Sequence, residues 1–116
     1  MSVKIYGYSG WSNCRKANSW LADKGIEFES LQVRKTPPTI AELEFACEHL
    51  GLKRLFNSSD MDYRSLGMKD KLPTMSETEA IKLLSENGNL VKRPLIIAKN
   101  GAVNGFKLPE WEAFFE

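Results

Sequence analysis

The chain has 116 residues, the size of one ordinary domain, and we expect residues 1–116 to form a single domain around one core. Hydrophobic residues make up 42% of it and charged residues 27%, a balance typical of folded globular proteins that excludes an intrinsically disordered chain. The net charge is +1 and no apolar run reaches the length of about 18 residues that a membrane span needs, so the sequence predicts a cytoplasmic protein that binds neither nucleic acid nor a membrane directly.

The first predicted elements are a strand and a helix joined by a short loop. Residues 3–8 are rich in β-branched and aromatic side chains, and Ser9-Gly10 marks the end of the strand that they predict. Apolar residues at helical spacing begin after Ser12, and either Ser12 or Asn13 is expected to cap the helix. Cys14 is therefore expected near a helix N-terminus.

A second strand and a second helix are predicted next. Gly25 is placed to end the first helix, and residues 26–33 read as a strand. The segment 36–38, Thr-Pro-Pro, then breaks regular structure, because proline removes a backbone donor and restricts the residue before it. The segment 39–42, Thr-Ile-Ala-Glu, has the spacing of a capping box, so a helix is predicted over residues 40–50.

The middle of the chain reads as mainly helical. Residues 52–56 are compatible with one helical turn, and the polar residues 57–60 predict a loop. The segment 76–79, Ser-Glu-Thr-Glu, repeats the capping-box signal before another apolar stripe. The segment 87–89, Asn-Gly-Asn, should end that helix.

The last part of the chain predicts a hairpin and a short helix. The apolar run 95–98 is followed by an Asn100-Gly101 turn and a second strand over residues 103–106. Pro109 is tolerated in the first turn of a final helix that carries Trp111. The complete order predicts an α/β fold, a mixed β-sheet flanked by helices, with a helical insertion in the middle of the chain.

Several segments of the sequence share one likeness. They are residues 4–17 around Cys14 with Trp20-Leu21, residues 63–67 and Ser76-Glu77, and residues 90–95 with Gly105-Phe106. Their order and spacing over nearly the whole chain resemble the arsenate reductase (ArsC)/Spx/MgsR-like family. This resemblance implies a thioredoxin-like fold in which Pro94 is a cis-proline that faces the cysteine loop.

The sequence departs from this family at the position that matters most for catalysis. In the family's arsenate reductases a cysteine at the first position of the loop attacks the oxyanion, assisted by arginines. Trp11 stands at that position here, and indole has no usable nucleophile. Cys14 matches instead the second cysteine of Spx-type proteins. Arg93 matches a family arginine, residues 57–59 lack the arginine of many relatives, and Lys107 is an open substitute for another cation.

Cys14 has two interpretations that the sequence leaves open. The positive end of the helix, together with Arg15 and Lys16, would stabilise a thiolate and lower the pKa of the thiol. Alternatively, the side chain points inward and Cys14 is a small apolar core residue.

Arg93, Lys92 and Trp11 complete the candidate site. Arg93 could present a planar fork to an oxyanion or support the thiolate, and Lys92 could add a point charge, because both precede Pro94. The alternative for Arg93 is a surface arginine paired with an acidic residue. Trp11 at a loop tip would close the former substrate pocket, stack on a partner, or pack on the helix, and the sequence does not choose among these.

The remaining cysteine and histidine favour a structural role. Cys47 falls on the same apolar stripe as Leu43 and Leu50, so packing explains it without chemistry. His49 points to a different face of that helix, which argues against a metal pair and for a solvated surface group. The sequence therefore predicts no metal site.

Two functional hypotheses follow. The first is an arsenate-reductase-like protein that has lost the usual nucleophile and acts as a single-cysteine thiol oxidoreductase through Cys14, with no bound cofactor and with glutathione, glutaredoxin or another thiol as co-substrate. The second is a non-catalytic, Spx-like regulatory or protein-binding domain, for which the resemblance suggests RNA polymerase as the partner. A degenerate domain kept for stability or assembly is a third possibility.

Overall fold

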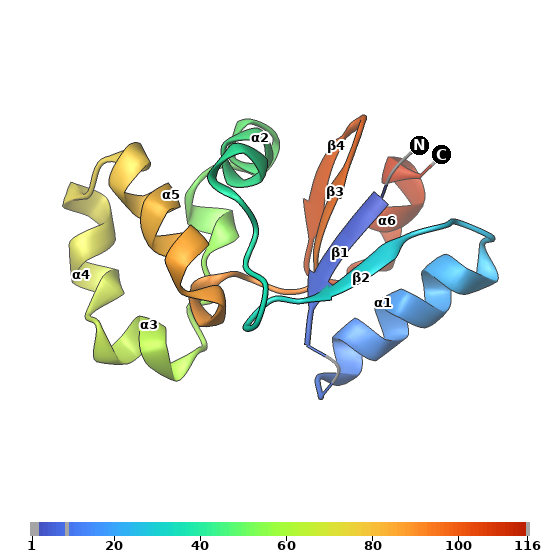
Figure 1. Ribbon diagram of the computed structural model, residues 1–116, viewed down its shortest axis with the longest axis horizontal. Coiled ribbons are helices and arrows are strands. Elements are labelled where there is room, and N and C mark those ends of the chain that lie inside the picture. The colour runs from blue at the N-terminus through green and yellow to red at the C-terminus, as the bar shows by residue number, and fades with distance from the viewer. Residues whose placement is uncertain (1–2, 9, 116) are drawn as a thin grey trace.

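The computed structural model of the protein describes residues 3–8 and 10–115. Within these residues, four strands form one mixed sheet in the order β2-β1-β3-β4 (Figure 1). β1 (Val3–Gly7) is parallel to β2 (Glu29–Gln32) and antiparallel to β3 (Leu95–Ala98), which pairs antiparallel with β4 (Gly101–Asn104). The two edge strands, β2 and β4, thus come from distant parts of the sequence.

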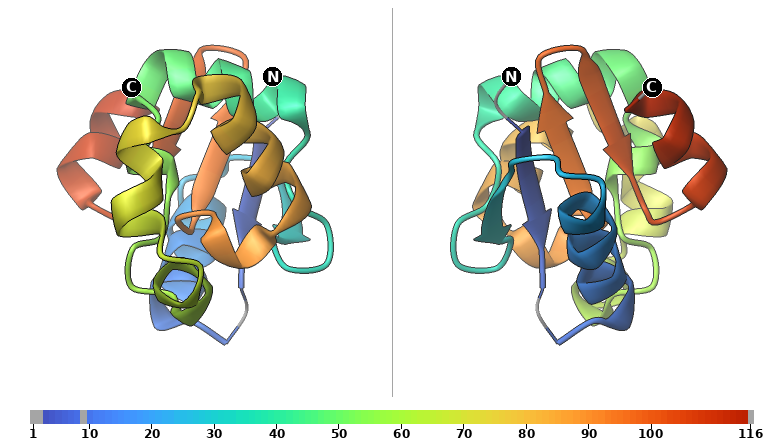
Figure 2. Two further views of the ribbon diagram at one scale, coloured as in Figure 1. Left: turned by 90° about the vertical axis from the view of Figure 1, so that its left-hand side faces the viewer. Right: turned by 90° about the vertical axis from the view of Figure 1, so that its right-hand side faces the viewer.

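Helices cover both faces of the sheet, as the two side views in Figure 2 show. α1 (Ser12–Asp23) and α6 (Leu108–Phe114) lie on one face, and α2 (Ile40–Leu50) and α5 (Glu77–Glu86) lie on the other side. Side chains of β1 alternate between the two layers: Val3 and Ile5 are buried against α1 and α6, whereas Tyr6 joins the cluster formed with α2 and α5. The predicted α/β fold, a thioredoxin-like sheet flanked by helices, is confirmed.

The segment between β2 and β3 is the predicted helical insertion, and it occupies the left half of Figure 1. Besides α2 and α5 it contains two short helices and three single 3₁₀ turns. These are η1 (Lys53–Leu55), α3 (Met61–Ser65), α4 (Met68–Lys71), η2 (Leu72–Thr74) and η3 (Gly88–Leu90). The insertion has its own buried residues, so it adds a second hydrophobic layer to the sheet rather than a loose loop.

Most predicted helix boundaries are confirmed by capping contacts. The Thr39 hydroxyl accepts a hydrogen bond from the Glu42 backbone N–H, and the Glu42 carboxylate accepts one from the Thr39 backbone N–H, which is the predicted capping box of α2. Ser76 caps α5 through the Glu79 N–H. Gly25, with a positive φ of 72°, ends α1 as expected.

Two strand boundaries differ from the prediction. The second strand begins at Glu29 rather than Ile26. Glu29 pairs with Lys4, and β1 begins at Val3, one residue before Lys4, so β1 is too short to pair with residues as far back as Ile26. In the hairpin, Gly101 already pairs with Ala98, so the second strand starts earlier than residue 103 and ends at Asn104. Ser9, part of the predicted strand end, lies outside the described residues.

No helix within the described residues is both long and apolar enough to cross a membrane.

Candidate functional site

The site is built around the loop between β1 and α1. Trp11 has an extended backbone (φ −95°, ψ 129°) and is the N-cap residue of α1, without a side-chain capping bond. Its N–H donates to the Tyr8 carbonyl, and its own carbonyl accepts the Arg15 N–H. Ser12 and Asn13 are exposed residues within the first turn, so the prediction that one of them caps the helix is wrong: the backbone of Trp11 already takes the capping position.

The Cys14 side chain points into the protein and is only 3% exposed. Its Sγ accepts a hydrogen bond from the Tyr8 backbone N–H at 3.4 Å. A Cβ on Gly7 would lie 3.2 Å from this sulfur, so the glycine allows the close approach of β1. The cavity beside Cys14 has a volume of about 20 Å³, room for one water molecule and not for a tripeptide thiol.

Burial raises the pKa of the Cys14 thiol, and the Tyr8 N–H and the positive charge of Arg93 oppose this rise only in part. Of the two interpretations that the sequence left open, this direction opposes the stabilised thiolate, because the cost of removing the thiolate from water exceeds the gain from nearby positive charge. The alternative, a small buried residue, describes the side chain correctly. Whether Cys14 reacts stays a prediction.

Arg93 is a buried cation between the cysteine loop and the insertion. It precedes Pro94 in a cis peptide bond, as the resemblance implied, and its side chain is fully shielded from solvent. Nη2 donates to Oδ2 of Asp60 at 3.3 Å and to the carbonyl of Asn89 at 3.2 Å. Arg93 is thus paired with a carboxylate, as its alternative interpretation held, but in the interior rather than on the surface.

The other two guanidinium nitrogens of Arg93, Nε and Nη1, are buried and have no hydrogen-bond partner among the described residues. A buried donor without a partner is costly, so such groups in a folded protein call for an explanation. Burial and the like charge of Arg34 lower the pKa of Arg93, while Asp60 and Cys14 act in the opposite direction. Arg93 therefore carries unused binding capacity.

Trp11 covers the guanidinium of Arg93. The Arg93 guanidinium carbon lies 4.8 Å from the centre of the Trp11 ring, a cation–π distance. Trp11 is 37% exposed, so contact with the arginine leaves part of the residue open to solvent. Among the three interpretations of Trp11, this contact agrees with closure of the pocket.

Two charged residues of the site were not predicted from the sequence. Arg34 stacks on Tyr8, with 4.4 Å between its guanidinium carbon and the ring centre, and its charge acts on Arg93. A usable signal existed, because Arg34 follows the strand that pairs parallel to β1, and the carboxyl ends of parallel strands meet at one edge. Asp60 lay in the predicted polar loop, with nothing in the sequence to connect it to Arg93.

Asp60 and Asp62 join the insertion to this site. Asp60 is the N-cap of α3, and its Oδ1 accepts the Asp62 N–H at 2.8 Å while Oδ2 faces Arg93. Oδ2 of Asp62 accepts hydrogen bonds from the side-chain amides of Asn89 and Asn87, both at 3.1 Å. These two bonds lower the pKa of Asp62. Asn89 therefore meets Arg93 through its backbone and Asp62 through its side chain.

Other candidate cations lie elsewhere. Arg15 is exposed and lines a shallow pocket with Lys16, Trp20 and Leu108, on the side of α1 that faces α6. Lys92 is half-buried, and its side chain passes close to Gly105.

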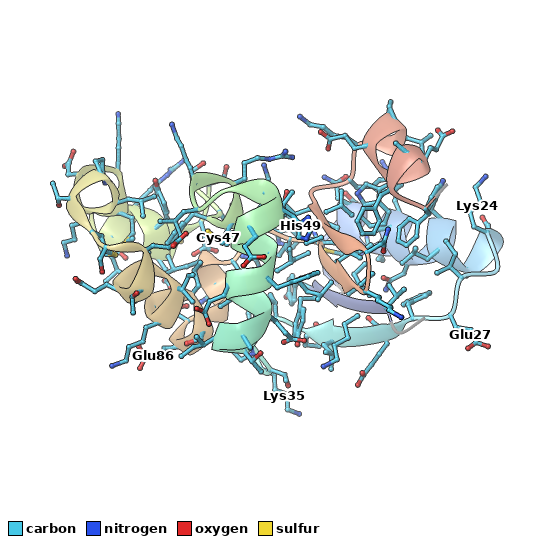
Figure 3. The ribbon with its side chains drawn as sticks, turned by 90° about the horizontal axis from the view of Figure 1, so that it is seen from above. Lys24, Glu27, Lys35, Cys47, His49 and Glu86 are labelled. Carbon is cyan, nitrogen blue, oxygen red and sulfur yellow. The ribbon has the colours of Figure 1, made fainter. Side chains whose placement is uncertain are left out.

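Cys47 and His49 lie on opposite sides of α2, as Figure 3 shows. Cys47 is 8% exposed, and its thiol donates to Oε1 of Glu77 on α5 at 2.8 Å. His49 is exposed and contacts Phe45, beside Gly101 of the hairpin. The predicted packing role of Cys47 and the exposed position of His49 are confirmed, and no group of three or more potential metal ligands occurs among the described residues.

Comparison with known proteins gives a consistent result. The model of the ArsC family matches residues 6–114. A crystal structure of an ArsC-family-related protein from Bacteroides fragilis is 39% identical, with a TM-score of 0.90 and 97% of each chain covered. An arsenate reductase of Neisseria meningitidis is 28% identical over 96% of both chains. The global transcriptional regulator Spx 2 of Lactococcus lactis is 26% identical, covering 97% of this chain and 85% of the relative.

Proposed function

We propose, from the premise that this chain belongs to the ArsC family, that it acts by binding another protein and does not reduce arsenate. One observation carries the proposal: the indole of Trp11 stands where the family's reductases carry their nucleophile, and it covers the guanidinium of Arg93. The residue at the nucleophile position and the cation that would hold an oxyanion thus contact each other, so neither is available to an oxyanion.

Loss of reductase chemistry follows from what that chemistry requires. A nucleophilic thiol must be exposed and largely ionised at neutral pH. Cys14 is 3% exposed and its pKa is raised, and the charge of Arg93 is already balanced by Asp60. These features oppose both steps of the family reaction, oxyanion binding and attack by sulfur.

The same contacts favour a binding surface at Trp11. An exposed indole whose inner face rests on a buried cation is held in one place, so its burial by a partner costs little conformational entropy. Tryptophan and arginine are enriched among the residues that dominate protein–protein affinity. A relative of this chain is named a global transcriptional regulator, and RNA polymerase is accordingly the first partner to test, in the cytoplasmic location that the sequence predicts.

The binding proposal is tested with purified RNA polymerase and three variants. We expect the parent and Cys14→Ser to bind equally, whereas Trp11→Ala weakens binding at least tenfold, an effect of about 1.4 kcal/mol. Ile40→Ala is the matched control, because Ile40 is a similarly exposed hydrophobic residue on α2. Binding that survives Trp11→Ala, or that is lost with Cys14→Ser, would contradict the proposal.

The catalytic half of the proposal has a separate test. Arsenate reduction is measured with glutathione and glutaredoxin present, using a family reductase as the positive control. We expect turnover indistinguishable from a reaction without protein. Turnover abolished by Cys14→Ser would favour the enzyme instead.

A second candidate function is thiol–disulfide exchange at Cys14. It is favoured by the Tyr8 N–H and the Arg93 charge, which both stabilise a thiolate at this position. In that reaction the Cys14 thiolate attacks one sulfur of oxidised glutathione, a mixed disulfide forms, and one glutathione leaves as its thiolate. Burial of Cys14 makes it the weaker candidate.

A further inference from the structure

The interaction between Arg93 and Asp60 has a form that capping alone does not explain. The two carboxylate oxygens of Asp60 do different work: Oδ1 caps α3 through the Asp62 N–H, and Oδ2 accepts from Arg93. Asparagine or serine would cap the helix as well as aspartate does. The cap itself therefore does not require the negative charge of Asp60, and the oxygen that does not cap α3 faces Arg93.

Arg93 has the surroundings of an anion site. Its side chain is fully shielded, two of its nitrogens lack partners among the described residues, and Arg34 adds a second positive charge nearby. The first turn of α1 contains no acidic residue and has no side-chain cap. Without Asp60, this region would keep the positive charges of Arg93 and Arg34 and would lose one carboxylate. The result would be a strong excess of positive charge in a desolvated place.

We infer that Asp60 is an internal anion that keeps this arginine from binding a tetrahedral oxyanion. Its Oδ2 takes a guanidinium donor that an external oxyanion would use, and its charge cancels the attraction that would draw that oxyanion in. Trp11 adds a cover that is partly open to solvent, because its ring lies over the guanidinium. This inference rests on the proposed loss of oxyanion chemistry and assigns Asp60 as the residue that maintains it.

Sulfate is the probe for this inference, titrated by calorimetry at constant ionic strength with chloride as the balancing anion. Asp60→Asn removes the charge and keeps a good helix cap. Asp70→Asn is the matched control, because Asp70 is an exposed residue of α4 and the substitution changes the net charge equally. Asp60→Ser serves as a second variant, and Arg93→Gln is added to Asp60→Asn to test whether the arginine is the binding group.

We expect Asp60→Asn to bind sulfate at least about tenfold more tightly than the parent, from loss of a charged hydrogen-bond partner. Asp70→Asn should match the parent, and Arg93→Gln should abolish the gain. Equal binding by the parent and Asp60→Asn, an equal gain in Asp70→Asn, or a gain that survives Arg93→Gln would each overturn the inference. Unfolding of both Asp60 variants would overturn it too, since Asp60 would then be a structural requirement.

The outcome is separable from that of the proposed function. Arsenate turnover by the parent would contradict the proposed function whatever the variants bind. Failure of the Asp60 variants to gain sulfate affinity, with no turnover by the parent, would contradict this inference alone.

Discussion

The residues of the candidate site form one connected charge arrangement rather than a set of independent groups. Trp11 lies on Arg93, Arg93 pairs with Asp60, and the charge of Arg93 reaches Cys14. The contact between the Trp11 indole and the Arg93 guanidinium is worth roughly 0.5–2 kcal/mol, depending on desolvation.

The first prediction concerns the reactivity of Cys14, measured by iodoacetamide alkylation in a Cys47→Ser background. Because burial raises the pKa of Cys14, the thiolate should form only above the pH at which an ordinary thiol ionises, and alkylation at neutral pH should be slower than in the urea-unfolded chain. Arg93→Ala should move the pH midpoint still higher, since the charge of Arg93 lowers this pKa.

The unfolded chain is the internal reference for that measurement. Fast alkylation of the folded protein at neutral pH, with a midpoint below that of the unfolded thiol, would instead support thiol–disulfide exchange at Cys14.

Among the elements, α2 and α5 are held to each other by both apolar and polar contacts. Leu43 and Ala46 of α2 and Leu84 of α5 are fully buried in one cluster. The thiol of Cys47 adds a hydrogen bond to Glu77, across the interface between the two helices. Burial and the Glu77 carboxylate raise the pKa of Cys47 to about 11.

This raised pKa predicts how stability depends on pH. The contribution of the Cys47 thiol should be fully present below the pKa of an unfolded cysteine and should be lost as pH rises toward about 11. Because solvent partly screens the Cys47 thiol, the decrease in the free energy of unfolding is limited to about 1 kcal/mol. Urea unfolding of the parent and of Cys47→Ser, which keeps a donor for Glu77 but does not titrate, isolates this term.

The free energy of unfolding of the parent relative to Cys47→Ser should be constant up to neutral pH and should decrease in alkaline solution. A difference that stays constant through the alkaline range would show that the Cys47–Glu77 bond does not resist ionisation of the thiol.

At the scale of the whole molecule, close backbone contacts tie the insertion to the segment that follows β2 and to the residues that precede β3. Gly88 of η3 lies against the chain that leaves β2: a Cβ on Gly88 would be 1.8 Å from the Val33 carbonyl oxygen. Asn57 donates its N–H to Leu90 in the same region, and the Lys92 N–H donates to Leu55. These contacts fix the residues just before Arg93, and so they position the site.

Gly88→Ala should therefore destabilise the protein by about 3 kcal/mol or more, because a backbone carbonyl cannot move aside as a side chain can. Gly67→Ala is the control: its positive φ of 66° strains alanine, but nothing lies within 4 Å of the new Cβ, so the cost should be about 1 kcal/mol. Urea unfolding measures both. Equal losses of stability would contradict the close-approach argument.

The sequence by itself determined the α/β fold, the order of the main elements, the capping boxes at Thr39 and Ser76, and the packing role of Cys47. These depend on spacing along the chain, such as the separation of a cap from its third helical residue or the period of an apolar stripe.

Only the tertiary structure decided the character of the site. Residues far apart in sequence decide how deeply Cys14 is buried, what Arg93 pairs with and where Trp11 lies. Asp60 and Arg93, for example, are 33 positions apart. The direction of a pKa shift depends on how much water surrounds a group and which charges face it, and neither is written in local sequence. For this reason the sequence left Cys14 open between thiolate and core residue, and folding placed it in the core.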